Sequence, residues 1–116
     1  MAWMFENDRP IYVQIVEHIQ LSILAGEYKL GEKLPSVREL AAVAAVNPNT
    51  MQKAMVELER LGMVHAERTS GRFITDDVEM IDTLKNRLAK EYITEFLAKM
   101  QKIGYNAEDI VGMMEE

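Results

Sequence analysis

The chain has 116 residues and a formal net charge of -6, with no cysteine. This length allows one compact domain with an extension but not two large independent cores. The lack of cysteine excludes disulfides, thiolate catalysis and cysteine-ligated zinc, and no apolar run approaches the roughly 18 residues of a membrane-spanning helix. We therefore expect a cytoplasmic protein that does not enter a membrane.

The acidic residues are concentrated toward the carboxyl end. Residues 1–75 contain eight Lys or Arg and nine Asp or Glu, whereas residues 76–116 contain five and ten. A net negative charge argues against nonspecific binding to a polyanion, because such binding releases counterions through an excess of Lys and Arg. A near-neutral amino-terminal part can still bind nucleic acid if its cations converge on one face.

Residues 10–25 are predicted to form the first helix. Pro10 suits a first turn, and apolar residues recur at helical spacing from Ile11 to Ile23. Gly26 stands where a helix terminator is expected, and residues 27–35 are predicted to form a loop.

Two further helices are expected after this loop. Ser36 and Glu39 have the spacing of a capping box, which predicts a short helix from Ser36 to about Ala45. Asn47 followed by Pro48 then predicts the start of a third helix after a tight turn. The apolar positions of this third helix are expected to face the core and are Met51, Ala54, Met55, Leu58 and Leu61. Its opposite face carries Asn49, Gln52, Lys53, Val56 and Arg60.

A hairpin is predicted next. Gly62 closes the third helix, and residues 63–67 and 72–75 have the composition of two short strands around the turn residues 68–71.

The remaining residues predict one long helix and one short helix. An amphipathic pattern runs from Asp76 to Gly104, and Asn106 with Asp109 has the spacing of a second helix cap. The long helix would extend about 40 Å, farther than the small amino-terminal part can cover, so its apolar stripe needs a partner. A second copy of the chain is the simplest partner. The stripe starts at Ile81 and ends at Ile103, and its predicted dimerisation residues are Leu84, Leu88, Tyr92, Ile93, Phe96, Leu97 and Met100.

These elements predict an α+β fold that is mostly α: a winged helix-turn-helix of three helices and a two-stranded wing, then a two-helix dimerisation segment. This order of elements places one helix in the DNA major groove and a hairpin beside it. Asn49, Gln52 and Lys53 can address base edges or phosphates. The start of the third helix at Asn47 is expected to offer free N–H donors to a phosphate. Three arginines are predicted to flank the groove as backbone clamps, namely Arg38, Arg68 and Arg72.

Three stretches resemble the GntR family of bacterial regulators, and within it the short YtrA-like subfamily. The first is Pro10-Ile11-Tyr12 with Gln14-Ile15, and the second is Leu34-Pro35-Ser36-Val37-Arg38-Glu39-Leu40-Ala41. The third runs from Val46-Asn47-Pro48-Asn49-Thr50 to Leu58-Glu59. Together they cover about residues 10 to 75, in the order and at the spacing of the family.

The resemblance implies a set of DNA contacts. Arg38 would meet phosphate or base edges, and Gly71 would let the wing backbone approach the minor groove, with Phe73 anchoring the strand. Thr69 departs from the many relatives that have glycine there, so a stiffer wing tip is expected. The full predicted DNA-binding set is Ser36, Arg38, Asn47, Pro48, Asn49, Thr50, Gln52, Lys53, Arg68, Ser70, Gly71 and Arg72.

No other cluster predicts chemistry. His18 and His65 are the only histidines and lie on different elements, so we expect no metal and no cofactor. No nucleophile and base recur in a catalytic arrangement, so we expect no enzyme activity. Trp3 and Phe5 are expected to pack against the head or another subunit, with ligand stacking by Trp3 as an alternative. The nine methionines fit core filling better than a ligand pocket.

The predicted function is sequence-specific regulation of transcription. Residues 1–75 would bind double-stranded operator DNA, and residues 76–116 would form the homodimer or hold an effector that the sequence does not identify. We expect a repressor that binds an inverted repeat, and the subfamily resemblance implies control of a nearby operon, often one for a membrane transporter. The alternative is a protein-interaction module that docks through the acidic tail, in which case Lys53 and Arg38 would be dispensable.

Overall fold

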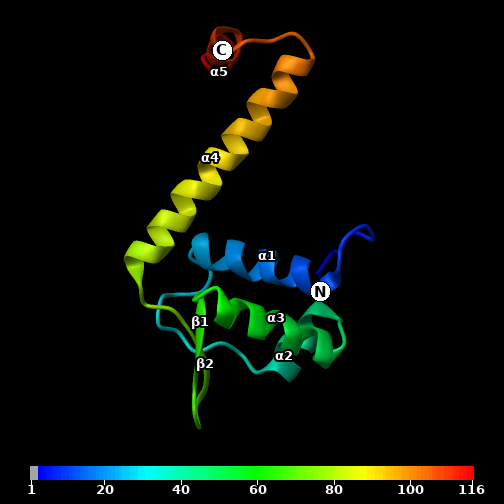
Figure 1. Cartoon of the computed structure of the whole chain (residues 1–116), viewed down its shortest axis with the longest axis vertical. Helices are drawn as coiled ribbons and strands as arrows, with labels where there is room; N and C mark the ends of the chain where they lie inside the picture. Colours follow the sequence, from blue (N-terminus) through cyan, green and yellow to red (C-terminus); the bar gives the residue numbers. More distant parts are fainter. Residues whose placement is uncertain (1–2) are drawn as a thin grey trace. The chain divides into compact units, whose positions relative to one another are not determined.

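The computed structural model describes residues 3–116. Its elements in chain order are α1 (Ile11–Leu24), α2 (Val37–Ala44), α3 (Pro48–Arg60), β1 (Val64–Glu67), β2 (Gly71–Ile74), α4 (Val78–Lys102) and α5 (Ala107–Met114) (Figure 1). They fall into two compact units, which we call the head (Met1–Val78) and the tail (Glu79–Glu116). Three helices, an antiparallel hairpin and two further helices confirm the predicted mostly helical α+β class.

The helix boundaries in the head follow the predicted capping residues. Gly26 has φ of 83°, as a left-handed helix terminator requires. The amide of Glu39 donates to Ser36 Oγ at 3.1 Å, and the amide of Ser36 donates to Glu39 Oε1 at 3.3 Å, so the capping box is confirmed. α2 ends through Ala45, whose φ of 59° is left-handed although it is not glycine. This conformation makes the tight turn that leads to Asn47 and α3.

The core of the head lies between α3 and the elements that pack on it, α1, α2 and β1. Its largest fully buried side chains are Ile15, Ile19, Met51, Met55, Leu58, Met63 and Ile74. Three of them are methionines, so the core-filling interpretation holds for these three, whereas Met4, Met113 and Met114 are exposed. Four of the five predicted core positions of α3 are thereby covered, and its polar face remains in solvent. The prediction is wrong for Leu61, which is 39% exposed because α3 ends at Arg60 and Leu61 lies at its cap.

The hairpin is joined by a third length of chain. β1 and β2 pair antiparallel with Val64 opposite Ile74. The segment before α2 was expected to be a loop, but it is hydrogen-bonded along β2: Leu34 N donates to Arg72 O at 2.9 Å, and Ile74 N donates to Glu32 O at 2.8 Å. These bonds fix the hairpin to the chain that enters α2.

The amino-terminal segment packs on α1. Gln14, which is buried, accepts a hydrogen bond from Glu6 N at 2.7 Å and donates to the carbonyls of Glu6 and Arg9, both at 2.9 Å. Trp3 stacks on His18 with ring centroids 3.8 Å apart. Of the two expected positions for this segment, the structure therefore shows the one against the head.

The tail consists of α4 and α5. The capping box at Asn106 and Asp109 is present, as predicted. The 25 residues of α4 give a length of about 38 Å. Along its apolar stripe Ile81 is buried, whereas Phe96 is 41% exposed and Ile93 is 57% exposed. No helix in residues 3–116 is long and apolar enough to cross a membrane.

Candidate nucleic-acid interface

The polar row of α3 is exposed, as the sequence predicted. Asn49, Gln52 and Lys53 all lie on the solvent side, while the neighbouring residues Met51 and Ala54 are buried. Asn and Gln amides match the donor and acceptor pattern of adenine, and Lys can bind guanine or phosphate. One face of a well-packed helix thus carries groups of the kind that read base edges.

The start of α3 differs from the expectation of free N–H donors, which is wrong for its first turn. Pro48 has no N–H group. Asn49 N donates to Asn47 Oδ1 at 2.7 Å, and the amides of Thr50 and Met51 donate to the Asn47 carbonyl at 3.0 and 3.1 Å. Because the Asn47 cap uses these donors, a ligand at this end must be bound by side chains.

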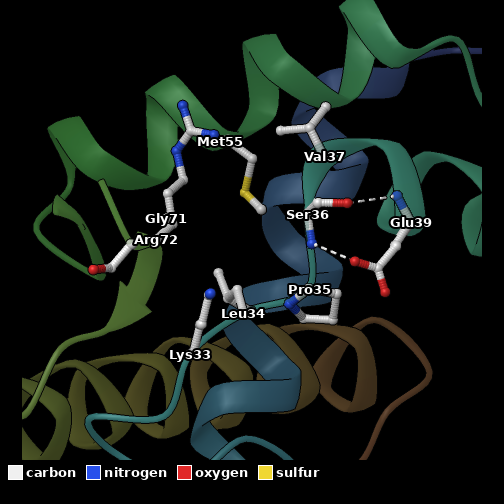
Figure 2. Close-up of a pocket in the computed structure, with 10 residues that line it drawn as sticks. Lys33, Leu34, Pro35, Ser36, Val37, Glu39, Met55, Gly71 and Arg72 are labelled. Carbon is white, nitrogen blue, oxygen red and sulfur yellow. Dashed lines mark hydrogen bonds between the residues drawn. The ribbon is translucent and has the colours of Figure 1, made fainter. Parts of the chain in front are cut away.

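A groove of about 580 Å³ lies beside α3. Figure 2 shows Gly71 and Arg72 of the hairpin on one side, Ser36 and Glu39 at the start of α2 on the other, and Met55 of α3 between them. Gly71 has φ of 106°, and the turn before it holds Arg68 and Ser70, both exposed. The groove therefore brings together three regions of the chain that the sequence analysis had selected separately.

The four cations predicted to meet DNA fall into two groups. Arg38, Lys53 and Arg68 are exposed and form no ion pair within residues 3–116. Arg72 instead pairs with Glu59 of α3, and only 21% and 31% of these two side chains are exposed. The guanidinium of Arg72 thus ties the hairpin to α3, a role that its position in the sequence did not reveal.

Two charged residues at the carboxyl end of α3, Glu57 and Arg60, pair with each other. Arg60 Nε donates to Glu57 Oε1 at 3.0 Å, and this hydrogen bond lowers the pKa of the Glu57 carboxyl. The Arg60 side chain is 68% exposed, so solvent screens this pair and it contributes little to stability. Within residues 3–116 no cluster of His, Cys, Asp and Glu has the arrangement of a metal site.

Two residues at this surface were missed by the sequence analysis. Lys33 lines the groove, and its Cε would lie 3.2 Å from a Cβ added at Gly71. Tyr12 of α1 places its ring under Lys53, whose Nζ is 4.1 Å from the ring centroid. Lys33 directly precedes the Leu34–Ala41 stretch and could have been found by that proximity, whereas the Tyr12 contact depends on how α1 packs against α3.

α3 exposes two amide side chains and a lysine, follows the capped helix α2, and is flanked by the hairpin. This arrangement defines a DNA-binding protein of the winged helix-turn-helix class. Residues 11–74 match the model of the family described as bacterial regulatory proteins, gntR family. The chain belongs to this GntR family of DNA-binding transcriptional regulators.

Three known proteins show how far the similarity extends. The HTH-type transcriptional repressor YtrA of Bacillus subtilis (strain 168) is 36% identical over 107 residues, which cover 90% of this chain and 81% of YtrA. A GntR family transcriptional regulator from Listeria monocytogenes has a TM-score of 0.87 at 40% identity, over 96% of this chain and 97% of that one. AraR(DBD), solved in complex with operator ORX1, has a TM-score of 0.58 at 26% identity, over 62% of this chain and 93% of that one.

These similarities also determine the broad type of protein. The family and the relatives are regulators of transcription, so the chain is a DNA-binding regulator and not an enzyme. The likeness to YtrA extends over 90% of this chain and 81% of YtrA and reaches into the tail, in agreement with the resemblance noted from three short stretches.

Proposed function

We propose that this protein is a homodimeric repressor that binds an inverted-repeat operator in a sequence-specific manner. The observation that carries the proposal is the exposed row Asn49, Gln52 and Lys53 on α3, beside a hairpin that is fixed to the same helix. Repression is proposed because YtrA, which is similar over most of its length, is named a repressor. Its place of action would be the cytoplasm, with the DNA.

The DNA contacts are proposed in two groups. Gln52 and Asn49 read base edges in the major groove, where each bidentate amide contact discriminates by about 1–3 kcal/mol. The exposed cations Arg38, Lys53 and Arg68 serve the phosphate backbone, which fixes the register of the head.

Small groups complete the proposed contact surface. The hydroxyl of Ser36 accepts a hydrogen bond in the capping box and still has its own hydrogen to donate to a phosphate. We propose the same role for the hydroxyls of Thr50 and Ser70, and Gly71 would let the hairpin backbone come close to the DNA. We add Lys33 to the set because it lines the same groove as Ser36, Ser70 and Gly71. Arg72 is assigned to holding the hairpin against α3.

The domain roles are proposed from the same layout. Residues 1–75 bind DNA, and residues 76–116 form the dimer. The support is the stripe on α4: Tyr92, Ile93 and Phe96 are all more than two-fifths exposed, which is unusual for large apolar groups at helical spacing. A second copy can cover the stripe by a two-fold arrangement.

The dimer proposal is tested by placing a charge on the stripe. Phe96→Glu is expected to raise the dimer dissociation constant by at least about tenfold, because a carboxylate would have to be buried without a partner. Ala98→Glu adds the same charge to the same helix at an exposed position outside the stripe and serves as the control. Sedimentation over a range of protein concentrations measures both, and a Phe96→Glu protein that stays as dimeric as Ala98→Glu refutes the assignment.

The regulatory role is tested on the DNA upstream of the protein's own gene. A gel shift at several salt concentrations, with unrelated DNA as competitor, should give a complex that weakens with salt and survives the competitor. Arg38→Ala and Lys53→Ala should weaken this complex. A folded, dimeric protein that gives no such complex, or loses nothing with both variants, favours the protein-interaction alternative. We also propose that the protein controls a nearby operon for a membrane transporter. This is tested by comparing the transcript levels of neighbouring genes in cells with and without the gene for this protein.

A further inference from the structure

Lys53, the proposed cation of the recognition helix, is held by an aromatic ring. Its Nζ lies 4.1 Å from the centroid of Tyr12, which stands in the first turn of α1. Tyr12 is half-buried, and α1 packs along α3, so the ring belongs to the framework of the head. Since Lys53 forms no ion pair within residues 3–116, the ring and not a carboxylate holds the ammonium group.

The chemistry of this contact leaves the ammonium able to bind an anion. The face of an aromatic ring carries negative charge density and attracts a cation within about 6 Å of its centroid. An ammonium group has three N–H donors, and the ring occupies only one side of it. A carboxylate partner would neutralise the charge, whereas the ring keeps the full positive charge and limits the number of side-chain conformations.

The location of the ring indicates which part of the DNA the ammonium meets. When a recognition helix lies in the major groove, the helix before it in the motif, here α2, crosses the sugar-phosphate backbone. α1 packs on the buried side of α3, so an ammonium drawn toward α1 is turned away from the exposed row and toward the edge of the groove. Lysine also lacks the bidentate geometry that favours a guanine edge, and it binds phosphate as a point charge.

We propose that Tyr12 is a positioning residue for DNA binding, whose ring holds the Lys53 ammonium for a backbone phosphate. Lys53 then gives a contact that does not depend on base sequence, and Asn49 and Gln52 carry the base recognition. The inference rests on the proposed role of Lys53 in DNA binding and adds the residue that positions it.

The test measures binding of the full chain to a mixed-sequence DNA duplex by fluorescence anisotropy over a range of salt concentrations. Lys53→Ala should weaken binding and reduce the slope of log K against log salt by about 0.9, the value for one phosphate contact. Tyr12→Leu removes the ring and keeps the charge, so it should weaken binding by about two- to fivefold with an unchanged slope. Tyr12→Phe keeps the ring and should stay within about twofold of the wild type.

Two further proteins separate positioning from damage to the fold. Tyr12→Leu combined with Lys53→Ala should bind no more weakly than Lys53→Ala alone, because the ring then has no cation to hold. Lys90→Ala removes the same charge from α4 and should leave the slope unchanged. Circular dichroism melting of each variant checks that the head is folded.

The outcomes distinguish the inference from the function on which it rests. If Lys53→Ala keeps wild-type affinity and slope, Lys53 has no role in DNA binding and the inference fails, whereas the proposed function is still tested by Arg38→Ala and by the operator gel shift. If Lys53→Ala weakens binding while Tyr12→Leu leaves it unchanged or tightens it, only the positioning role fails. If Tyr12→Phe binds DNA as weakly as Tyr12→Leu, the phenol hydroxyl itself meets the DNA. If Tyr12→Leu lowers the affinity as much in the Lys53→Ala protein as in the wild type, its effect is purely structural. Either result overturns the proposal.

Discussion

The contact between Arg72 and Glu59 gives a quantitative test of how the hairpin is held. Both side chains are less than one-third exposed. A hydrogen bond that involves charged groups contributes about 1.5–3 kcal/mol, and an exposed ion pair about 0–1 kcal/mol. This partly buried pair falls between those limits, so we expect a coupling energy of about 1–2 kcal/mol between the two side chains.

A double-mutant cycle of Arg72→Met and Glu59→Gln measures that coupling. Both changes remove the charge and keep much of the side-chain volume. Urea unfolding must be followed at one fixed protein concentration, because the stability of the proposed dimer would depend on concentration. A coupling energy near zero would show that the pair does not fix the hairpin.

The same variants separate this structural role from direct DNA binding. If Arg72 serves only to hold the hairpin, Arg72→Met leaves the slope of log K against log salt unchanged. If its guanidinium meets a phosphate, the slope falls by about 0.9. A reduced slope together with unchanged stability would refute the reasoning and restore the backbone-clamp role expected from the sequence.

Three further changes test local features of the head. Gly71→Ala should destabilise the head by about 1–3 kcal/mol, because φ is 106° and the new Cβ would meet Lys33. The control is Gly112→Ala, at an open position in a helix, which should stabilise the protein by about 0.5–1 kcal/mol in the same urea titration. Ser36→Ala should lower the free energy of unfolding by about 1 kcal/mol through loss of the α2 cap, and Ser36→Thr should keep most of this stability. Equal stability of the wild type and both variants would contradict the capping role. Burial and two neighbouring glutamates raise the pKa of Tyr28, so native protein favours the neutral phenol and stability should fall as pH rises above about 10. Tyr28→Phe should reduce that loss of stability, as measured by melting curves at alkaline pH. An identical pH dependence of Tyr28→Phe and the wild type would argue against a raised pKa of Tyr28 in the native protein.

Local chemistry made much of the fold predictable. Caps and terminators act over three or four residues, so Ser36 with Glu39, Asn47 with Pro48, and Gly26 indicated the helix ends directly from sequence spacing. The periodicity of α3 likewise separated its buried positions from the exposed row.

Contacts between distant residues were not predictable in the same way. Nothing in the spacing of Glu59 and Arg72 shows that one side chain faces the other across α3 and β2. The contact of Tyr12 with Lys53 depends on the packing of two helices. The expectation of free N–H groups at the start of α3 was wrong for a local reason. Asn47, which caps the helix, accepts the hydrogen bonds of the N–H groups that were expected to be free.

Selection of bound sequences from a random pool of duplex DNA, with the full chain, examines the proposed function most directly. The proposal predicts an enriched motif with two-fold symmetry, whose half-sites are separated by about one helical turn of 10–10.5 base pairs or a multiple of it. Failure to enrich any motif, or enrichment of a single motif without symmetry, would contradict a homodimer that reads an inverted repeat through α3.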